Sequence, residues 1–300
     1  MKHDYPAMGI GLLCRLFGKT RHAYYDALWR KKDTLLNEEI IINHILNIRK
    51  ELPRVGTRKL HYLLGPILAA HHIHIGRDQL FELLAEHRLL IRRRKKKVFT
   101  TDSRHWMRKY SNLVTDIKIT RPEQVWVSDI TYIAMAGKWG YLSLITDAYS
   151  RKIMGYCFRE DLSALGCIEA LHMALRNRIY NSDLIHHSDR GSQYCSSQYV
   201  DILIKNKIAI SMTQNGDPYE NALAERINGI IKTEFNLHNT QTGFEKTTIR
   251  ITDSINAYNN IRPHASCDYL TPEQAHCKTD SLKKRWKNYN KPKSKESIFV

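Results

Sequence analysis

The sequence predicts an α/β protein in which a mixed sheet flanked by helices follows a small all-α domain. Its 300 residues are enough for a large domain with a smaller companion, and 42% hydrophobic with 26% charged side chains is an ordinary globular composition. Helical periodicity dominates the first third of the chain, whereas strand-like segments alternate with helices from residue 123 onward. Such an alternation favours a sheet that is covered by helices.

The first third of the chain predicts three short helices and a basic linker. Helical patterns cover residues 37–52, 58–64 and 77–88. Thr57 is the expected N-cap of the second helix, and Gly65 with Pro66 should end it. A run of six basic residues follows the third helix: Arg92, Arg93, Arg94, Lys95, Lys96 and Lys97.

We interpret residues 37–98 as a helix-turn-helix-type DNA-binding domain with its linker, because the basic run would lie beside the recognition helix and contact phosphates. Residues 1–36 are then an N-terminal helical segment. The alternative is a small helical packing domain whose basic run is only a solvated tether.

Residues 110–276 carry the pattern of a mixed sheet. The first three strands are expected at residues 124–133, 140–146 and 151–158, close enough in the chain to form a meander. Helices and strands then alternate, in the order helix 162–179, strand 183–188, helix 197–205 and strand 208–212. Two further helices, 220–235 and 244–260, close this domain, and residues 277–300 form a basic tail.

The formal net charge of +17 predicts a polyanionic partner, most simply nucleic acid. Residues 1–110 hold 23 basic against 10 acidic side chains, and residues 281–300 hold 7 against 1. Residues 111–280 hold 17 basic against 19 acidic ones. A core that keeps its carboxylates between two basic ends suits a metal-dependent nuclease, since Mg²⁺ prefers carboxylate ligands. The alternative is a basic surface that merely keeps the protein soluble.

Charged residues interrupt every apolar run before it reaches the length of a membrane span, so no transmembrane helix is expected. The N-terminus lacks the small-residue cleavage site of a signal peptide, and the six cysteines are scattered without a C-x-x-C pair. We therefore expect a cytoplasmic protein without a disulfide scaffold.

Three acidic residues are candidate metal ligands. Asp129 lies inside the apolar strand WVSDITYI, where a carboxylate is costly unless it is paired. Asp189 ends a short strand, and Glu225 lies on a helix whose apolar residues imply packing against the sheet. Carboxylates from two strands and a packed helix can converge on two Mg²⁺ ions, which promote phosphoryl transfer. Taken singly, each carboxylate has an ordinary alternative: a salt bridge, an Asx-turn or a helix-surface charge.

Thirty-five residues separate Asp189 from Glu225, and Lys232 follows Glu225 by seven, two turns along the same helix face. This spacing resembles the D,D-35-E signature, with a trailing Lys or Arg, of retroviral integrases and bacterial insertion-sequence transposases. In order, the blocks VWVSDITYI, HHSDRGSQY, DPYENALAERINGIIKTE and YNNIRPHASCDYLTPEQA resemble the integrase core of IS-three-type transposases, specifically of their downstream product. RVGTRKLHYLL resembles the helix-turn-helix region of the same group.

The resemblance implies a ribonuclease-H-like fold and a DDE polynucleotidyl transferase that cleaves and joins DNA at the ends of a mobile element. Asp129, Asp189 and Glu225 are the implied catalytic and metal-binding triad, which would hold two Mg²⁺ ions or Mn²⁺ in their place. Further DNA contacts are expected at Lys232, Arg190, Arg262, His264 and the basic run 92–97. For Arg262 and His264 the alternative is that they lock the last helix onto the sheet.

The implied partners are double-stranded DNA, both the terminal inverted repeats and the target, and further copies of the chain assembled on that DNA at the bacterial nucleoid. In this group the upstream reading frame supplies another helix-turn-helix and a coiled-coil segment by fusion. The present chain shows no long heptad run, so we expect it to be poorly active on terminal repeats by itself.

Two other functions remain open from the sequence. A catalytically silent DNA-binding protein, or the remnant of a mobile element, should lack one of the carboxylates or have broken sequence blocks. A cellular ribonuclease H or junction resolvase should not need the basic N-terminal domain.

Overall fold

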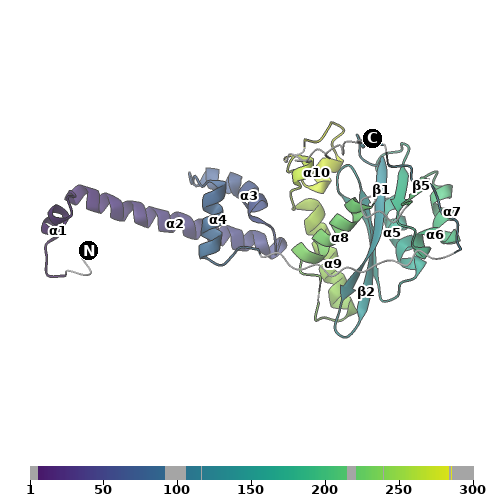
Figure 1. Ribbon diagram of the computed structural model, residues 1–300, viewed down its shortest axis with the longest axis horizontal. Helices are drawn as coiled ribbons and strands as arrows, with labels where there is room; N and C mark the ends of the chain where they lie inside the picture. Colours follow the sequence, from purple (N-terminus) through teal and green to yellow (C-terminus); the bar gives the residue numbers. More distant parts are fainter. Residues whose placement is uncertain are drawn as a thin grey trace, which may run out of the picture. The chain divides into compact units, whose positions relative to one another are not determined.

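The structure is a computed structural model that describes residues 6–91, 106–115, 117–214, 221–238, 240–283 and 285. The chain divides into two compact units, Met1–Lys50 with Gly56–Ile91, and Glu51–Val55 with Arg92–Val300 (Figure 1). We call the first the helical unit and the second the core unit. Within the described part of the chain, no helix is both long and apolar enough to cross a membrane.

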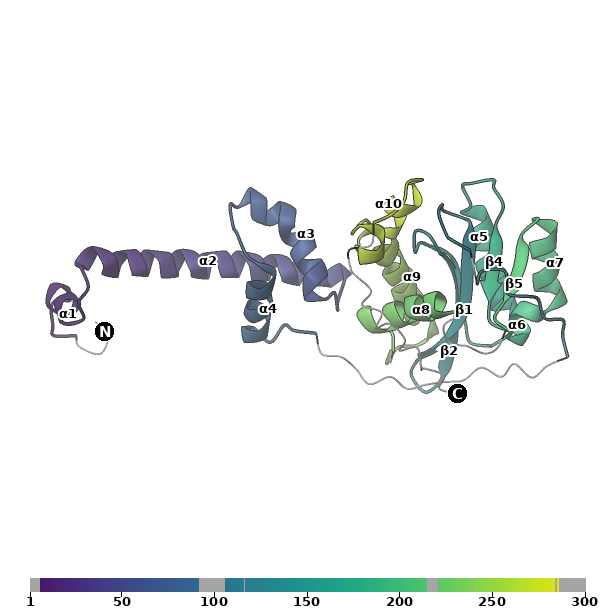
Figure 2. The same cartoon turned by 45° about the horizontal axis from the view of Figure 1, so that its top comes forward.

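The helical unit is built around one long helix. Its described residues form α1 (Ile10–Leu16), α2 (Arg21–Glu51), α3 (Thr57–Ala70) and α4 (Arg77–Glu86). Figures 1 and 2 both show α3 and α4 beside the C-terminal half of α2, where Ile41 and Ile45 are buried. Leucines at helical spacing supply the rest of this small core: Leu60, Leu64 and Leu68 of α3, and Leu80 and Leu84 of α4.

The long helix α2 extends well beyond its predicted start. The expected helix 37–52 is only its C-terminal half, since the helix begins at Arg21. It therefore runs without a break through residues 36 and 37, where we expected a boundary between two domains. The apolar pattern used for the prediction covers only the half of α2 that packs within the helical unit.

The end predicted for the second helix is wrong. α3 continues through the Gly-Pro pair at 65–66 as far as Ala70, and Thr57 is its first residue rather than its N-cap. A proline inside a helix removes one backbone hydrogen bond and costs about 3 kcal/mol. Leu64 and Leu68 are buried on either side of that proline, so tertiary packing outweighs the local cost.

The core unit contains a five-stranded mixed sheet among its described residues. β1 (Val125–Ala134), β2 (Trp139–Asp147) and β3 (Ile153–Arg159) form an antiparallel meander, and β4 (Ile185–Ser188) and β5 (Ala209–Met212) run parallel to β1. The strand order is β3-β2-β1-β4-β5. The predicted mixed sheet is confirmed, and its order is that of the ribonuclease-H-like fold that the resemblance implies.

Helices cover the sheet and fix where the site lies. They are α5 (Ala164–Arg176), α6 (Ser192–Cys195), α7 (Ser197–Lys205), α8 (Ala222–Glu234), α9 (Phe244–Asn260) and α10 (Pro272–His276), with a 3₁₀ turn at Ala265–Cys267. α5 packs on β2 and β3, and a Cβ added at Gly155 of β3 would lie 2.0 Å from the Ala170 carbonyl oxygen, so only glycine permits this approach. α8 packs on β1, beside the predicted carboxylates.

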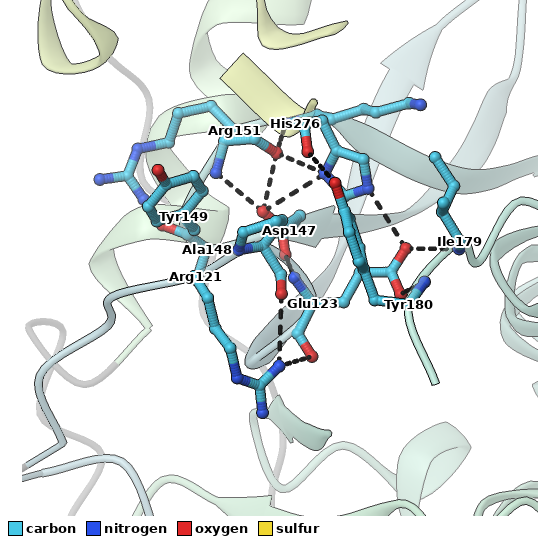
Figure 3. A network of polar contacts seen from close by, with 12 residues as sticks. Arg121, Glu123, Asp147, Ala148, Tyr149, Arg151, Ile179, Tyr180 and His276 are labelled. Atoms are coloured by element: carbon cyan, nitrogen blue, oxygen red, sulfur yellow. Dashed lines mark hydrogen bonds and ion pairs between the residues drawn. The ribbon is translucent and has the colours of Figure 1, made fainter. Parts of the chain in front are cut away.

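A buried polar network closes the end of the sheet where β1 begins (Figure 3). Glu123, Asp147 and His276 are all fully buried. His276 Nε2 lies 3.2 Å from Glu123 Oε1, and His276 Nδ1 lies 3.7 Å from Asp147 Oδ1 and 3.0 Å from the Ser150 hydroxyl. Burial opposes protonation of His276, but its hydrogen bonds to Asp147 and Glu123 outweigh burial and raise its pKa. The network thereby fastens α10 to the sheet.

Candidate active site

The register of β1 against β4 sets two candidate carboxylates side by side. Ser128 of β1 pairs with Ser188 of β4 in parallel, and the residues that follow them are Asp129 and Asp189. Neighbouring strands lie about 4.8 Å apart, so the two carboxylates leave adjacent chains at the same level. Both side chains are half-buried.

Asp129 lies in an environment that disfavours its charge. Burial raises the pKa of Asp129 to about 7, and the negative charges of Asp189 and, more weakly, Glu225 act in the same direction. Two hydrogen bonds oppose this effect: Asn228 Nδ2 donates to Asp129 Oδ2 at 2.8 Å, and the Ile130 backbone N–H donates to Oδ1 at 2.9 Å. Three acidic groups therefore act on one another, an accumulation of negative charge that a cation would relieve.

One face of α8 is turned toward Asp129. Glu225, Asn228 and Lys232 lie at positions i, i+3 and i+7 and therefore share a face. Asn228 is buried and bonded to Asp129. Lys232 is half-buried; burial lowers the pKa of its ammonium group, and the charge of Asp129 acts in the opposite direction. The face that carries Glu225 and Lys232 is thus the face that approaches β1.

The carboxylate of Glu225 does not complete a ligand cluster in this conformation. It is exposed, in the first turn of α8. Among the residues that the structure describes, no three His, Cys, Asp or Glu side chains are grouped closely enough to hold a metal ion. The structure brings Asp129 and Asp189 together and leaves Glu225 at the rim of the site.

A tight turn follows Asp189. The Gly191 backbone N–H donates to Asp189 Oδ1 at 3.0 Å, so the Asx-turn considered as the alternative role is present and orients the carboxylate. A Cβ at Gly191 would lie 3.1 Å from that oxygen, closer than a side chain is comfortably accommodated. Arg190, between them, is half-buried.

Two polar residues that the sequence interpretation missed support the carboxylates. His186 Nε2 lies 2.7 Å from the Ser128 hydroxyl and 2.8 Å from the Tyr199 hydroxyl. Burial, helped by the charge of neighbouring His187, lowers the pKa of His186 to about 3, so the ring is neutral and ties β1 to β4 and α7 directly behind the site. Asn228 is the second of these residues. The sequence could have indicated it, because it is a polar residue on the apolar face of the predicted helix, three positions after Glu225.

Arg262 and His264 are placed for packing rather than for phosphate contact. Arg262 is only 3% exposed, and its Nε and Nη2 each donate to the Glu234 carboxylate at 2.7 Å. Its guanidinium also lies over the Tyr258 ring, which His264 contacts edge-on. Between the two roles left open by the sequence, this geometry favours locking the last helix onto the core. The basic run 92–97 lies outside the described residues.

Two protein families and several known proteins match this chain in sequence, and the family matches cover the part of the chain that carries the three carboxylates. An integrase core domain family matches residues 119–218, and a second integrase core domain family matches residues 206–272. The chain is 34% identical over 268 residues to the "Insertion element IS600 uncharacterized 31 kDa protein" of Shigella sonnei, covering 87% of this chain and 96% of that protein. It is 33% identical over 163 residues to "Transposase InsF for insertion sequence IS3A" of Escherichia coli strain K12, covering 54% of this chain and 57% of that protein.

Among solved structures, the HTLV-2 integrase catalytic core domain in complex with magnesium is similar at 19% identity and a TM-score of 0.43, over 52% of this chain and 97% of that chain. The sequence matches carry the assignment, because the two domain matches span all three carboxylates and the IS600 relative is matched over nearly its whole length. This chain belongs to the integrase-core transposases of bacterial insertion sequences of the IS3 type, whose function is DNA transposition.

Proposed function

We propose that this transposase is a DDE polynucleotidyl transferase that uses Asp129, Asp189 and Glu225 to cleave DNA at the ends of an insertion sequence and to join those ends to new DNA. The observation that carries the proposal is the parallel register that sets Asp129 beside Asp189. The hydrogen bond from Asn228 to Asp129 adds the Glu225 face of α8 to the same site.

The donor set fits two Mg²⁺ ions, or Mn²⁺ in their place. Carboxylates are the ligands that these hard cations prefer. Burial, and after it the negative charges of Asp189 and Glu225, raises the pKa of Asp129, so a bound cation would favour its ionised form. Asp129 and Asp189 would hold the ions, and Glu225 would join them once its exposed side chain turns toward β1. Two bound ions supply an activated attacking oxygen and stabilise the leaving oxygen of the displaced phosphodiester.

The surrounding residues orient the carboxylates and grip the DNA. Asn228 fixes one oxygen of Asp129, and the neutral His186 keeps β1 and β4 together behind it. Lys232, half-buried two turns along α8 from Glu225, would bind a phosphate next to the carboxylates, because an ammonium group contacts phosphate as a point charge and does not compete for metal. Arg190 would contact the same DNA from the turn after β4.

In the helical unit, charge indicates which helix approaches DNA. α3 carries Arg58 and Lys59 in its first turn, whereas α4 exposes three acidic side chains, Asp78, Glu82 and Glu86, of which only Asp78 is paired among the described residues, with Arg77. Phosphates repel such a surface, since non-specific DNA affinity comes from basic residues. We therefore assign phosphate contact in this unit to the start of α3 and not to α4, the helix first expected to read the groove. The basic run 92–97, which follows this unit in the chain, stays a predicted DNA contact.

The substrates would be double-stranded DNA, namely the terminal inverted repeats of the element and the target, so the protein would act at the bacterial nucleoid. Several copies would assemble on the two ends, with the upstream reading-frame product fused to some of them. Such an assembly would supply the additional DNA affinity that one chain by itself lacks.

DNA cleavage with a matched pair of variants tests the proposed function. The full chain, alone and fused to the upstream product, is incubated with labelled terminal-repeat DNA and Mg²⁺ or Mn²⁺. We expect metal-dependent nicks at the repeat ends and joined products, lost in Asp189→Asn and kept in Asp201→Asn, an exposed aspartate of α7. Equal nicking by the wild type and Asp189→Asn overturns the proposal. Binding of the repeats without nicking in either metal supports a catalytically silent DNA-binding protein instead.

A further inference from the structure

A buried amide oxygen beside the two aspartates has no hydrogen-bond partner among the described residues. It belongs to Asn221, the residue directly before α8, whose side chain is only 6% exposed. Its Nδ2 donates to the Ser128 carbonyl oxygen of β1 at 3.1 Å, whereas its Oδ1 is buried and accepts no hydrogen bond from the described part of the chain. A buried acceptor without a donor is destabilising, so the unpartnered oxygen indicates a functional role.

The side chain of Asn221 also leaves unused the role that its position offers. Asn221 is the N-cap of α8, where an asparagine oxygen commonly accepts a hydrogen bond from the first turn of the helix, but its side chain makes no such bond. Turning the amide over would place Oδ1 against the Ser128 carbonyl oxygen, and two acceptors would then face each other. The bond to β1 thus fixes which atom of the amide stays without a partner.

The backbone places this amide at the gap between the two strands that carry the aspartates. The Gln124 carbonyl oxygen accepts a hydrogen bond from the backbone of β4, and carbonyl groups at every second residue of a strand point to the same side. The Ser128 carbonyl therefore also points toward β4. The next residue of β1 is Asp129, and the residue beside it after β4 is Asp189. The amide of Asn221 thus lies where the two aspartates leave adjacent strands.

A second amide on the same helix repeats the arrangement. Asn228 is 3% exposed, its Nδ2 donates to Asp129 Oδ2, and its Oδ1 is likewise buried without a partner in the described part of the chain. α8 lies along β1 in Figures 1 and 2. Asn221 and Asn228 are seven residues apart, which is two helical turns, with Glu225 between them on the same face. Two buried amide oxygens therefore accompany the candidate carboxylates on α8.

Water in the shell of a divalent cation would supply the donors that these oxygens lack. Mg²⁺ binds in octahedral geometry, dehydrates reluctantly and usually keeps several of its waters. The structure brings two of the three candidate carboxylates together, so much of the shell of a bound ion would be water. The ion polarises the O–H bonds of these waters, which then need acceptors. A neutral amide oxygen serves as an acceptor without adding a further negative charge beside Asp129.

We propose that Asn221 is a positioning residue of the metal centre, whose amide oxygen accepts a hydrogen bond from a water molecule in the shell of the bound Mg²⁺. Asn228 would hold a second water in the same way, while its Nδ2 orients Asp129. The inference rests on the proposed function, because it requires that Asp129 and Asp189 bind the ion. It adds residues that hold the ion through its water and not by direct ligation.

Mn²⁺ titration of the full-length chain without DNA, followed by the loss of the free-ion signal in electron paramagnetic resonance, tests the proposal. The site-specific component is the binding that Asp129→Asn abolishes. We expect Asn221→Ala to raise the dissociation constant of this component about tenfold or more. Asn221→Asp keeps an oxygen at this position and adds a negative charge, so it should bind Mn²⁺ at least as tightly as the wild type. Asn256→Ala, at an exposed position of α9, should bind as the wild type does.

A residue that only fastens α8 to β1 would give a different pattern. Asn221→Ala and Asn221→Asp both remove the Nδ2 donor, so both would then weaken Mn²⁺ binding alike, or neither would. Either result overturns the inference. Melting temperatures without metal show at which temperature every variant is folded for the titration, and the rise in melting temperature with Mn²⁺ gives a second reading of affinity.

The same titration separates this inference from the proposed function. Site-specific binding that Asp129→Asn abolishes and Asn221→Ala leaves unchanged overturns the inference alone. A wild-type chain without site-specific Mn²⁺ binding contradicts the proposed function and, with it, the inference.

Discussion

Replacing Asn228 with alanine tests how the site holds its first carboxylate. Asn228 is the one side-chain donor to Asp129 among the described residues, through a hydrogen bond of 2.8 Å. A hydrogen bond to a charged group contributes about 1.5–3 kcal/mol. If the transition state for DNA joining depends on the whole of this bond, Asn228→Ala should slow the reaction by about 10- to 150-fold.

Single-turnover joining of a pre-cleaved repeat end, measured over a range of Mg²⁺ concentrations, gives the rate and the metal requirement separately. We expect Asn228→Ala to lower the maximal joining rate. It should also raise the Mg²⁺ concentration at which the rate is half-maximal, because the Asp129 carboxylate is no longer oriented. Thr233→Ala, at an exposed position of the same helix, should change neither quantity. Wild-type rate and wild-type Mg²⁺ dependence in Asn228→Ala, with the fold intact, would refute this reasoning.

Three further changes test the scaffold around the site. Gly155→Ala should destabilise the core unit by about 2–3 kcal/mol, because its Cβ would meet the backbone of α5. Gly229→Ala is the control, since its Cβ would enter open space and should be tolerated. Equal melting temperatures of the two variants would contradict the expected clash at Gly155. Arg262→Ala removes the two hydrogen bonds of the buried guanidinium to the Glu234 carboxylate and should cost about 3–5 kcal/mol in denaturant unfolding. The DNA affinity of the folded protein should be unchanged, whereas weaker DNA binding at full stability would restore the phosphate role. The folded-state pKa of His276 is raised above the unfolded value of about 6.5, so its stabilising contribution is complete below that pH and is lost as pH rises through the folded-state pKa. The stability advantage of the wild type over His276→Gln should therefore shrink in alkali, and an advantage that grows there would contradict the account.

The sheet of the core unit was predictable because its strands are short apolar segments separated by turn residues, and each strand departs from its predicted bounds by at most two residues. The helical unit was harder. Leu64 and Leu68 carry α3 through a proline that local rules place at a helix end. Residues 1–36 were expected only as a separate helical segment. Because the first half of α2 has no buried face, apolar periodicity could not show that it is continuous with the helix expected at 37–52.

For the site, sequence spacing was enough to select Asp129, Asp189 and Glu225 as candidates, but not to place them. The adjacency of the two aspartates follows from pairing between β1 and β4, which are distant in the chain, and no local pattern encodes that register. The same holds for the hydrogen bond from Asn228 to Asp129. The role of Arg262 could not be predicted from the sequence, because its context fits DNA contact and packing equally well. Its burial against Glu234 in the structure favours packing.

Binding of Mn²⁺ to the chain on terminal-repeat DNA, followed by electron paramagnetic resonance, tests most directly whether the acidic residues form a metal centre. The account predicts two bound ions per active site in the wild type and in Asp201→Asn, loss of binding in Asp129→Asn, and weakened binding in Glu225→Gln. Wild-type occupancy in Asp129→Asn, or no specific Mn²⁺ binding by the wild type, would contradict it.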